Sequence, residues 1–423
     1  SAVIREILAN PEAYGRSEYG RDEKVMVEFV SANPTGPMHM GNARGGALGD
    51  CLAAVLDKAG YNAWRGFFVN DAGNQIEKFG CSLEARYLQI FKGDEIEFPE
   101  DGYQGEDIKD LAKEYADLNG DSLVNVSAEE RKKALVDYAL PKNIKKMQAD
   151  MEKYKIFYDK WFFESELHKS GAVKAVVDLL TKKGLTYEKD GAVWYKNKEV
   201  LTQKLLKEGK SQKYIDNLEL KDDVLIRQNG NPTYFTADIA YHKNKFNRGF
   251  TTLIDVWGAD HHGHVMRMKG AMDAIGYDGD KLNVVLMQLV KLVKDGELVR
   301  MSKRTGKAIQ LGDLLDEVPV DSARFLFNTK EANTQMDFDL DLAVSQDNQN
   351  PVYYVQYAHA RICSIFKSLA KEGISPRECT DAELALLTAP EEKELINHLA
   401  SYTNEIISAA KDYDPTKVTR YVT

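Results

Sequence analysis

The segment over residues 25–69 constrains the fold most, because it has the pattern of a strand, a helix and a second strand. Residues 25–30 are β-branched, aromatic and almost entirely apolar, which is typical of a central strand buried on both faces. A helical pattern follows over about residues 43–58, and Gly60 is placed to cap its C-terminal end. The second strand, over residues 64–69, completes the repeating unit of a parallel sheet. We therefore predict an α/β fold.

The remainder of the chain has three further patterns. Charged, helix-favouring sequence dominates up to about residue 198, which predicts a mostly helical insertion. Strand patterns return at residues 224–226 and 251–257, and Asp295-Gly296 between two apolar runs predicts a hairpin. Helical patterns dominate from residue 345 onward. We accordingly expect four parts, which cover residues 1–90, 91–198, 199–344 and 345–423.

Composition and charge exclude several classes of protein. The 423 residues include 56 Lys and Arg against 66 Asp and Glu, so the formal net charge is −10 and a general basic coat for nucleic acid is excluded. Four cysteines are widely scattered without a C-x-x-C pair, which excludes a disulfide framework and indicates a reducing, cytoplasmic location. No apolar run approaches the ~18 residues of a membrane helix, so we expect no membrane partner.

The sharpest local feature is P-M-H-M-G-N over residues 37–42, between the first strand and its helix. Free backbone N–H groups and the positive dipole end make a helix N-terminus suitable for phosphate. Gly41 would let a polyphosphate or an adenine approach the backbone, and His39 and Asn42 lie three residues apart in the first turn. Taken alone, a capping turn with an incidental histidine is the plainer interpretation.

A second feature is the basic, glycine-containing loop R-M-S-K-R-T-G-K over residues 300–307, which follows the predicted hairpin. Lys303, Arg304 and Lys307 carry the charge that would stabilise a departing pyrophosphate. Taken alone, a solvated basic loop is again the plainer interpretation.

Together the two motifs resemble the paired signature of class I aminoacyl-tRNA synthetases. Asn42 stands where the first signature usually ends in histidine, and Arg300 stands where the second usually begins with lysine. Longer segments narrow the resemblance to the arginyl-tRNA synthetases of bacterial type. These segments span nearly the whole chain, and they are VEFVSANPTGP at 27–37, VNDAGNQ at 69–75, YFTAD at 234–238, WGADHHGH at 257–264 and NPVYYVQYAH at 350–359.

This resemblance implies a Rossmann-like nucleotide-binding catalytic domain with a helical insertion, followed by an all-α anticodon-binding domain. It implies ATP-dependent activation of L-arginine to arginyl-adenylate, and transfer of the arginine to the 3′ end of tRNA(Arg). The implied partners are tRNA(Arg), L-arginine and ATP, with Mg²⁺ accompanying ATP and the chain acting as a monomer. Full-length relatives carry an N-terminal domain and a longer anticodon domain, so we expect this chain to be truncated at both ends.

An arginine pocket needs carboxylates, because a guanidinium is planar, always charged and rich in donors. Glu28 interrupts an apolar strand, and Tyr234 and Asp238 share one face if their segment is helical. The resemblance implies that these three residues contact the guanidinium side of the substrate. The alternatives are a salt bridge from Glu28 to an arginine such as Arg44, and surface pairing or capping by Tyr234 and Asp238. The resemblance implies contacts to the backbone end of the amino acid or nearby ATP groups from Ser31, Asn33 and Asn42. It also implies a contact to the amino acid from His261.

For ATP, the resemblance implies that His39 and the helix amides hold the phosphates, while Lys303 with Ser302 closes over the pyrophosphate. The residues with implied catalytic roles are His39, Asn42, Ser302 and Lys303. The residues expected to bind ATP are Pro37, His39, Gly41, Asn42, Gly258, Asp260, His264, Met301, Ser302 and Lys303.

Three alternatives remain open at this point. Three histidines and an aspartate over residues 260–264 suggest a metal hydrolase, although no cysteine or second histidine cluster completes a metal site and we expect none. A nucleotidyltransferase of the same fold acting on a small molecule is a second alternative, which the helical segment after residue 345 disfavours. A non-catalytic tRNA-binding relative is the third, and it is disfavoured by intact Glu28, His39, Asp238 and Lys303.

Overall fold

The computed structural model describes residues 2–299 and 309–423, and its centre is a five-stranded sheet. The strands follow the order β3-β2-β1-β7-β8, and every neighbouring pair is parallel. The predicted α/β fold with a parallel sheet is therefore confirmed. The strand bounds are Lys24–Glu28 for β1, Asn62–Val69 for β2, Lys160–Phe163 for β3, Thr252–Gly258 for β7 and Leu282–Met287 for β8.

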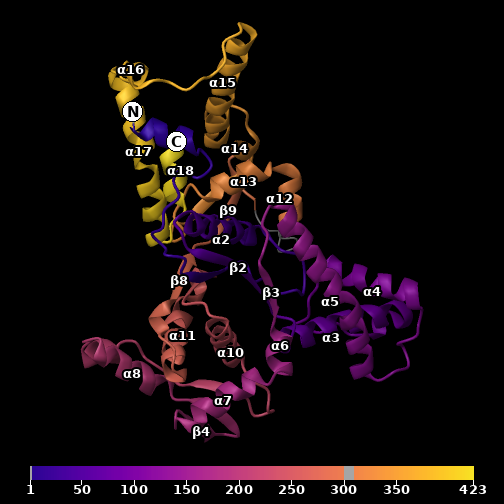
Figure 1. Cartoon of the computed structure of the whole chain (residues 1–423). Coiled ribbons are helices and arrows are strands. Elements are labelled where there is room, and N and C mark those ends of the chain that lie inside the picture. Colours follow the sequence, from indigo (N-terminus) through magenta and orange to yellow (C-terminus); the bar gives the residue numbers. More distant parts are fainter. Residues whose placement is uncertain (1, 300–308) are drawn as a thin grey trace.

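Strand β1 lies in the middle of the sheet because its side chains are apolar on both faces. Val25 packs into a core with α2 (Met40–Lys58), whereas Met26 packs into a second core with α10 (Tyr234–Asn247) and α11 (His262–Ile275). Figure 1 shows α2 on one side of the sheet and the pair α10 and α11 on the other. This burial on both faces is what a parallel sheet covered by helices requires.

The order of the sheet reverses between β1 and β7. The chain passes outward from β1 through β2 and β3, and then crosses to the other side of β1 to form β7 and β8. The C-terminal ends of β1 and β7 therefore open side by side, and the connections that leave them diverge. Ligands of open α/β sheets bind at such a point, so the fold places a site after Glu28 and Gly258.

Strands lie within the predicted helical insertion, and one of them belongs to the central sheet. Three helices, α3 (Asn74–Lys92), α4 (Glu106–Asn119) and α5 (Ala128–Lys153), pack around a core of their own and project to one side of the sheet (Figure 1). However, residues 160–163 form β3, an edge strand of the central sheet, within the range 91–198 that was expected to be a mostly helical insertion. Four residues between charged helical segments give too short a pattern to be recognised.

A smaller unit of helices and strands follows β3 and leads into α10. Its strands form an antiparallel sheet in the order β4-β5-β6, and the last of them precedes α10, so this unit positions Tyr234 at the start of that helix. The elements are α6 (Glu164–Lys169), α7 (Ala172–Lys182), β4 (Thr186–Lys189), β5 (Ala192–Tyr195), α8 (Asn197–Lys207), α9 (Gln212–Asp216) and β6 (Asp223–Ile226).

The predicted hairpin at Asp295 and Gly296 is confirmed. Strands β9 (Val290–Lys294) and β10 (Glu297–Leu298) are antiparallel, and β11 (Met336–Asp339) pairs with β9 on its other side. Asp295 and Gly296 have φ of 53° and 74°, as a two-residue hairpin turn of type I′ requires.

The described chain after residue 345 is helical, as predicted. Helix α17 (Pro390–Lys411) packs against α2 and α18 (Thr416–Val422), and the N-terminal helix α1 (Ala2–Ala9) lies against α17. Within the described residues, no helix is both long and apolar enough to cross a membrane. The other helices after residue 309 are α12 (Leu311–Glu317), α13 (Val320–Phe327), α14 (Leu340–Val344), α15 (Pro351–Lys371) and α16 (Asp381–Leu384).

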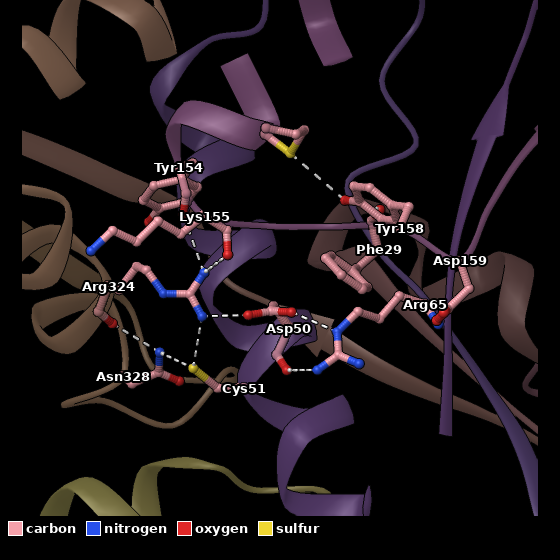
Figure 2. A network of polar contacts seen from close by, with 11 residues as sticks. Phe29, Asp50, Cys51, Arg65, Tyr154, Lys155, Tyr158, Asp159, Arg324 and Asn328 are labelled. Atoms are coloured by element: carbon pink, nitrogen blue, oxygen red, sulfur yellow. Dashed lines mark hydrogen bonds and ion pairs between the residues drawn. The ribbon is translucent and has the colours of Figure 1, made fainter. Parts of the chain in front are cut away.

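A polar network fastens α2 to other parts of the core. Figure 2 shows Asp50 of α2 between two arginines: Arg65 of β2 donates from Nε to its Oδ1 at 2.6 Å, and Arg324 of α13 donates from Nη2 to its Oδ2. Arg324 also donates to the backbone carbonyls of Tyr154 and Lys155, just after α5, at 3.3 and 3.4 Å. The Asp50 carboxylate thus ties α2 to β2 and α13, and Arg324 extends the network to the segment just after α5.

Candidate active site

A cavity of about 680 Å³ opens at the point where β1 and β7 end. Its walls are the turn after β1, the N-terminus of α2, the inner face of α10, and the segment from the end of β7 into α11. The position agrees with the place where an open α/β sheet binds ligands. The predicted site residues that line it are Glu28, Ser31, Asn33, Pro37, His39, Asn42, Tyr234, Asp238, Gly258, His261 and His264.

The N-terminus of α2 is closed by a reciprocal cap. The Gly41 N–H donates to His39 Nδ1 at 3.1 Å, and the His39 N–H donates to Asn42 Oδ1 at 2.9 Å. Burial lowers the pKa of His39 and so favours the neutral ring. Because Nδ1 accepts, the proton of that neutral ring lies on Nε2. The cap therefore holds His39 at the cavity wall as a hydrogen-bond donor.

Gly41 makes this cap possible. A Cβ at this position would lie 3.0 Å from His39 Cε1 and 3.1 Å from His39 Nδ1, so a side chain would push the imidazole away. Gly41 is not among the described residues that line the cavity. The structure thus gives Gly41 a role in seating His39, and its close approach to a ligand stays a prediction.

Part of the predicted phosphate site lies outside the described residues, namely Met301, Ser302 and Lys303. The chain that follows them is described and lies directly against the α2 cap. The Met40 N–H donates to the Ile309 carbonyl at 3.1 Å, and the Leu311 N–H donates to the Met38 carbonyl at 2.8 Å. Backbone hydrogen bonds therefore join the first motif to Ile309 and Leu311, which follow the basic loop in the sequence.

The opposite end of the cavity is acidic. Helix α10 begins at Tyr234, which confirms that Tyr234 and Asp238 lie on one helical face. Nε2 of His264, in the first turn of α11, lies 3.2 Å from Asp238 Oδ2, and 35% of the Asp238 side chain is exposed. A planar cation at this end would meet a carboxylate and a phenol together.

A second carboxylate, which the sequence patterns missed, lies behind Tyr234. Glu164 begins α6 directly after β3, its side chain is 4% exposed, and it shares with Tyr234 a neighbouring cavity of about 620 Å³. Its Oε1 lies 3.2 Å from His168 Nε2, and Asn70, with its amide oriented to donate, reaches Oε2 at 3.0 Å. Burial raises the pKa of Glu164, and the negative charge of Asp238 adds to the rise. Because the preceding strand β3 is too short to be recognised from its own sequence, no sequence signal marked Glu164.

Glu28 lines the cavity with a cationic partner already in place. Its Oε2 forms an ion pair with Lys245 of α10, whose side chain is fully buried. The alternative partner Arg44 is wrong, because Arg44 donates at 2.9 Å to the backbone carbonyls of Gln288 and Glu331. The buried carboxylate therefore needs no guanidinium from a ligand to balance its charge.

Behind Glu28 the charges balance within the protein. Lys245 Nζ also binds Asp255 Oδ1 at 2.9 Å, and His242 Nε2 lies 2.7 Å from Asp255 Oδ2. Since His242 Nδ1 lies 2.8 Å from the Asp238 carbonyl oxygen, both ring nitrogens face acceptors, as an imidazolium does. Burial alone would raise the pKa of Asp255, but the charges of Lys245 and His242 lower it to about 2. Two carboxylates, a lysine and an imidazole thus form a connected polar set beneath the cavity.

The end of β7 supplies the remaining wall. Gly258 and His261 line the cavity, whereas the Asp260 side chain is 80% exposed and does not belong to the described lining. His264, expected on the nucleotide, contacts Asp238 at the acidic end. Across residues 2–299 and 309–423, no three His, Cys, Asp or Glu side chains are grouped so that they could hold a metal ion.

Comparison with known families agrees with this geometry. Residues 3–363 match the family described as tRNA synthetases class I (R), catalytic domain. Residues 355–423 match the DALR anticodon binding domain. The parallel sheet with its cavity and the helical C-terminal segment correspond to these two matches.

Individual relatives carry the same assignment. The arginine–tRNA ligase of Ruminiclostridium cellulolyticum is 57% identical over 422 residues, which cover 99% of this chain and 72% of that protein. The enzyme of the same name from Caldanaerobacter subterraneus is 57% identical over 421 residues, with the same coverage. A solved structure from Campylobacter jejuni, described as an arginyl-tRNA synthetase, has a TM-score of 0.83 at 34% identity and covers all of this chain and 87% of its own. The arginyl-tRNA synthetase structure of Thermus thermophilus, at 21% identity and TM-score 0.72, shares the fold over all of this chain and 75% of its own. The chain therefore belongs to the arginyl-tRNA synthetases, the class I enzymes that act as arginine–tRNA ligases.

Proposed function

We propose that the cavity binds arginine and ATP end to end, with the guanidinium at the acidic end and the phosphates at the N-terminus of α2. The observation that carries this proposal is the separation of charge along one cavity. Asp238, with Glu164 behind Tyr234, makes one end acidic. The His39 imidazole and the backbone amides of α2 make the other end rich in donors.

At the acidic end, the Asp238 carboxylate suits the planar fork of a guanidinium better than the point charge of lysine, and the charge of Glu164, buried behind Tyr234, adds to the attraction. Tyr234 lines both cavities and supplies a phenol and an aromatic face. The amino and carboxylate groups of arginine would then lie toward the turn after β1, where Asn33, Asn42 and His261 line the cavity.

At the phosphate end, the arginine carboxylate would attack the α-phosphorus of ATP in line, giving arginyl-adenylate and pyrophosphate. The terminal ribose hydroxyl of tRNA(Arg) would then attack the adenylate carbonyl and release AMP. Catalysis of this kind rests on positioning and on charge stabilisation. His39 donates its Nε2–H to a phosphate oxygen, and Lys303 with Ser302 stabilises the departing pyrophosphate. Pro37 and Gly258 line the wall that the nucleoside would meet.

ATP use is common to the family, and Mg²⁺ would arrive bound to the phosphates of ATP, where it supplies charge neutralisation. The proposal includes a monomer that acts in the cytoplasm, where tRNA is charged.

The test is ATP–pyrophosphate exchange with each amino acid in turn, with and without tRNA(Arg). Exchange that depends on arginine supports the assignment of the cavity, and His39→Ala should lower its rate. Calorimetry with arginine and with ATP separates binding from chemistry. Exchange with a different amino acid, or full activity of His39→Ala, would contradict the proposed arrangement.

A further inference from the structure

The backbone directly after β1 is strained where it enters the cavity. The Ser31 N–H donates to the Phe29 carbonyl at 3.0 Å, and Val30 between them has φ of 69°. A hydrogen bond that spans three residues around a positive φ marks the rare, strained form of γ-turn. Val30 is β-branched, for which a positive φ is a real outlier, and Ser31 continues at φ of 41°. Two consecutive side chains thus occupy a region that glycine favours.

The Ser31 hydroxyl holds this turn in place. It donates to Glu28 Oε1 at 2.9 Å and accepts from the Phe68 N–H of β2 at 3.1 Å. The pairing of β1 with β2 ends at Glu28, where the chain after β1 turns away. The Ser31 hydroxyl therefore accepts the hydrogen bond from the Phe68 N–H in place of a β1 backbone carbonyl. Because its one proton is given to Glu28, the hydroxyl has none left to donate to a substrate.

Glu28 is in turn fixed from behind. Its Oε2 forms an ion pair with the fully buried Lys245. Lys245 also binds Asp255, and its Nζ lies 4.6 Å from the centroid of the Tyr241 ring. Both carboxylate oxygens of Glu28 are therefore engaged inside the protein. A carboxylate held in this way is a fixed acceptor for the Ser31 hydroxyl.

We propose that Glu28 and Lys245 are positioning residues that act on the substrate through Ser31, by holding the strained turn at Val30 and Ser31. The turn aims the following residues, Ala32 and Asn33, into the cavity. This inference rests on the proposed function, because it takes the cavity as the arginine site. It replaces a direct bond from Glu28 to the guanidinium with an indirect, geometric effect.

The test compares two substitutions of the same hydroxyl. Ser31→Ala and Ser31→Gly both remove the bonds to Glu28 and Phe68, but only glycine adopts a positive φ without strain. We expect Ser31→Ala to weaken arginine binding about tenfold by calorimetry, and Ser31→Gly to stay within about threefold of the parent chain. ATP binding should change less than threefold in both variants. Equal losses of arginine affinity would show that the hydroxyl itself matters, and would overturn the inference.

The thermal stability of Ser31→Ala and Ser31→Gly tests the strain at Ser31 without any ligand. Glycine ordinarily costs stability relative to alanine, but alanine at a positive φ costs more. Ser31→Gly should therefore unfold at the same or a higher temperature than Ser31→Ala. A lower unfolding temperature for Ser31→Gly would refute the strain, whether or not the chain binds arginine. Failure of the parent chain to bind arginine would contradict the proposed function alone.

Glu28 itself is tested in two backgrounds. Glu28→Gln should weaken arginine binding about tenfold in the parent chain, and less than threefold in the Val30→Gly background, where the turn no longer needs to be held. Val30→Ala is the matched control, since it trims the side chain but keeps the Cβ, and Glu28→Gln should lose about tenfold there too. An equal tenfold loss in all three backgrounds would mean that Glu28 meets the guanidinium directly, and would overturn the proposal.

Discussion

Replacing Asp238 by asparagine should weaken arginine binding much more than ATP binding. Asparagine keeps the size of the side chain and an oxygen for His264, which lies 3.2 Å from Asp238 Oδ2, so the packing of α10 against α11 is retained. What the substitution removes is the negative charge. Only the guanidinium needs that charge, since ATP is itself an anion.

The magnitude follows from the exposure of the group. A charge-assisted hydrogen bond contributes about 1.5–3 kcal/mol when shielded, and a fully exposed ion pair contributes about 0–1 kcal/mol. With 35% of its side chain exposed, Asp238 lies between these limits. We expect a loss of about 2 kcal/mol, which corresponds to roughly thirtyfold weaker arginine binding.

Isothermal calorimetry with arginine and with ATP measures both affinities in one preparation. Asp178→Asn on α7 is a matched control, because it makes the same change in net charge at a side chain that is 61% exposed and pairs with Lys174. It should leave both affinities within about twofold. Equal losses for arginine and ATP in Asp238→Asn, or no loss at all, would refute a charge-specific contact with the substrate.

Further predictions concern other charged groups. Arginine affinity should fall as the pH drops through the raised pKa of Glu164, because the protonated carboxyl no longer attracts a guanidinium, and calorimetry of Glu164→Gln across a pH series should show that dependence removed. Asp50→Asn should lower the free energy of unfolding in urea by about 3 kcal/mol, because two arginines lose a shared carboxylate that is 12% exposed. The pKa of Asp255 is lowered to about 2, so its charge contributes stability that is present above the usual pKa of an aspartate and is lost as the pH falls toward 2. In acid-unfolding measurements, Asp255→Asn should therefore lose about 2 kcal/mol less free energy of unfolding over this pH range than the parent chain. Lys303→Ala should slow pyrophosphate exchange while arginine affinity by calorimetry stays near that of the parent chain.

The residue pattern predicted those parts of the fold that depend on local sequence. The β1-α2-β2 unit, the hairpin at Asp295 and the helical C-terminal segment each depend on side chains close together in the chain. Strand β3 was not predicted, because its own four-residue pattern is short and its strand conformation depends on pairing with β2. Tertiary pairing, which no window of sequence contains, decides such an element.

At the site, too, local motifs could be predicted from the sequence, whereas contacts between distant segments could not. His39, Asn42, Tyr234 and Asp238 lie within short motifs, and the structure brings them to one cavity. The partner of Glu28 depends on distant packing: Lys245 is one of 56 Lys and Arg residues, and nothing in its own segment marks it as buried. Arg44 was nearer in the sequence, but it lies on α2 and faces backbone carbonyls. Sequence motifs therefore predicted the surface of the cavity, while its supporting charges required the fold.

The balance of charge explains why Glu28 and Lys245 are paired at all. Arginine carries a positive group at one end and the reacting carboxylate at the other, so a cavity that is acidic at Asp238 and rich in donors at His39 accepts it in one orientation. An unpaired carboxylate at Glu28, beneath the cavity between these ends, would draw the guanidinium toward the reacting end and compete with Asp238. Pairing with Lys245 removes that competing charge and leaves Glu28 to serve the turn at Ser31. The orientation of the substrate then depends on the carboxylates at the acidic end, which is where substitutions should alter arginine recognition most.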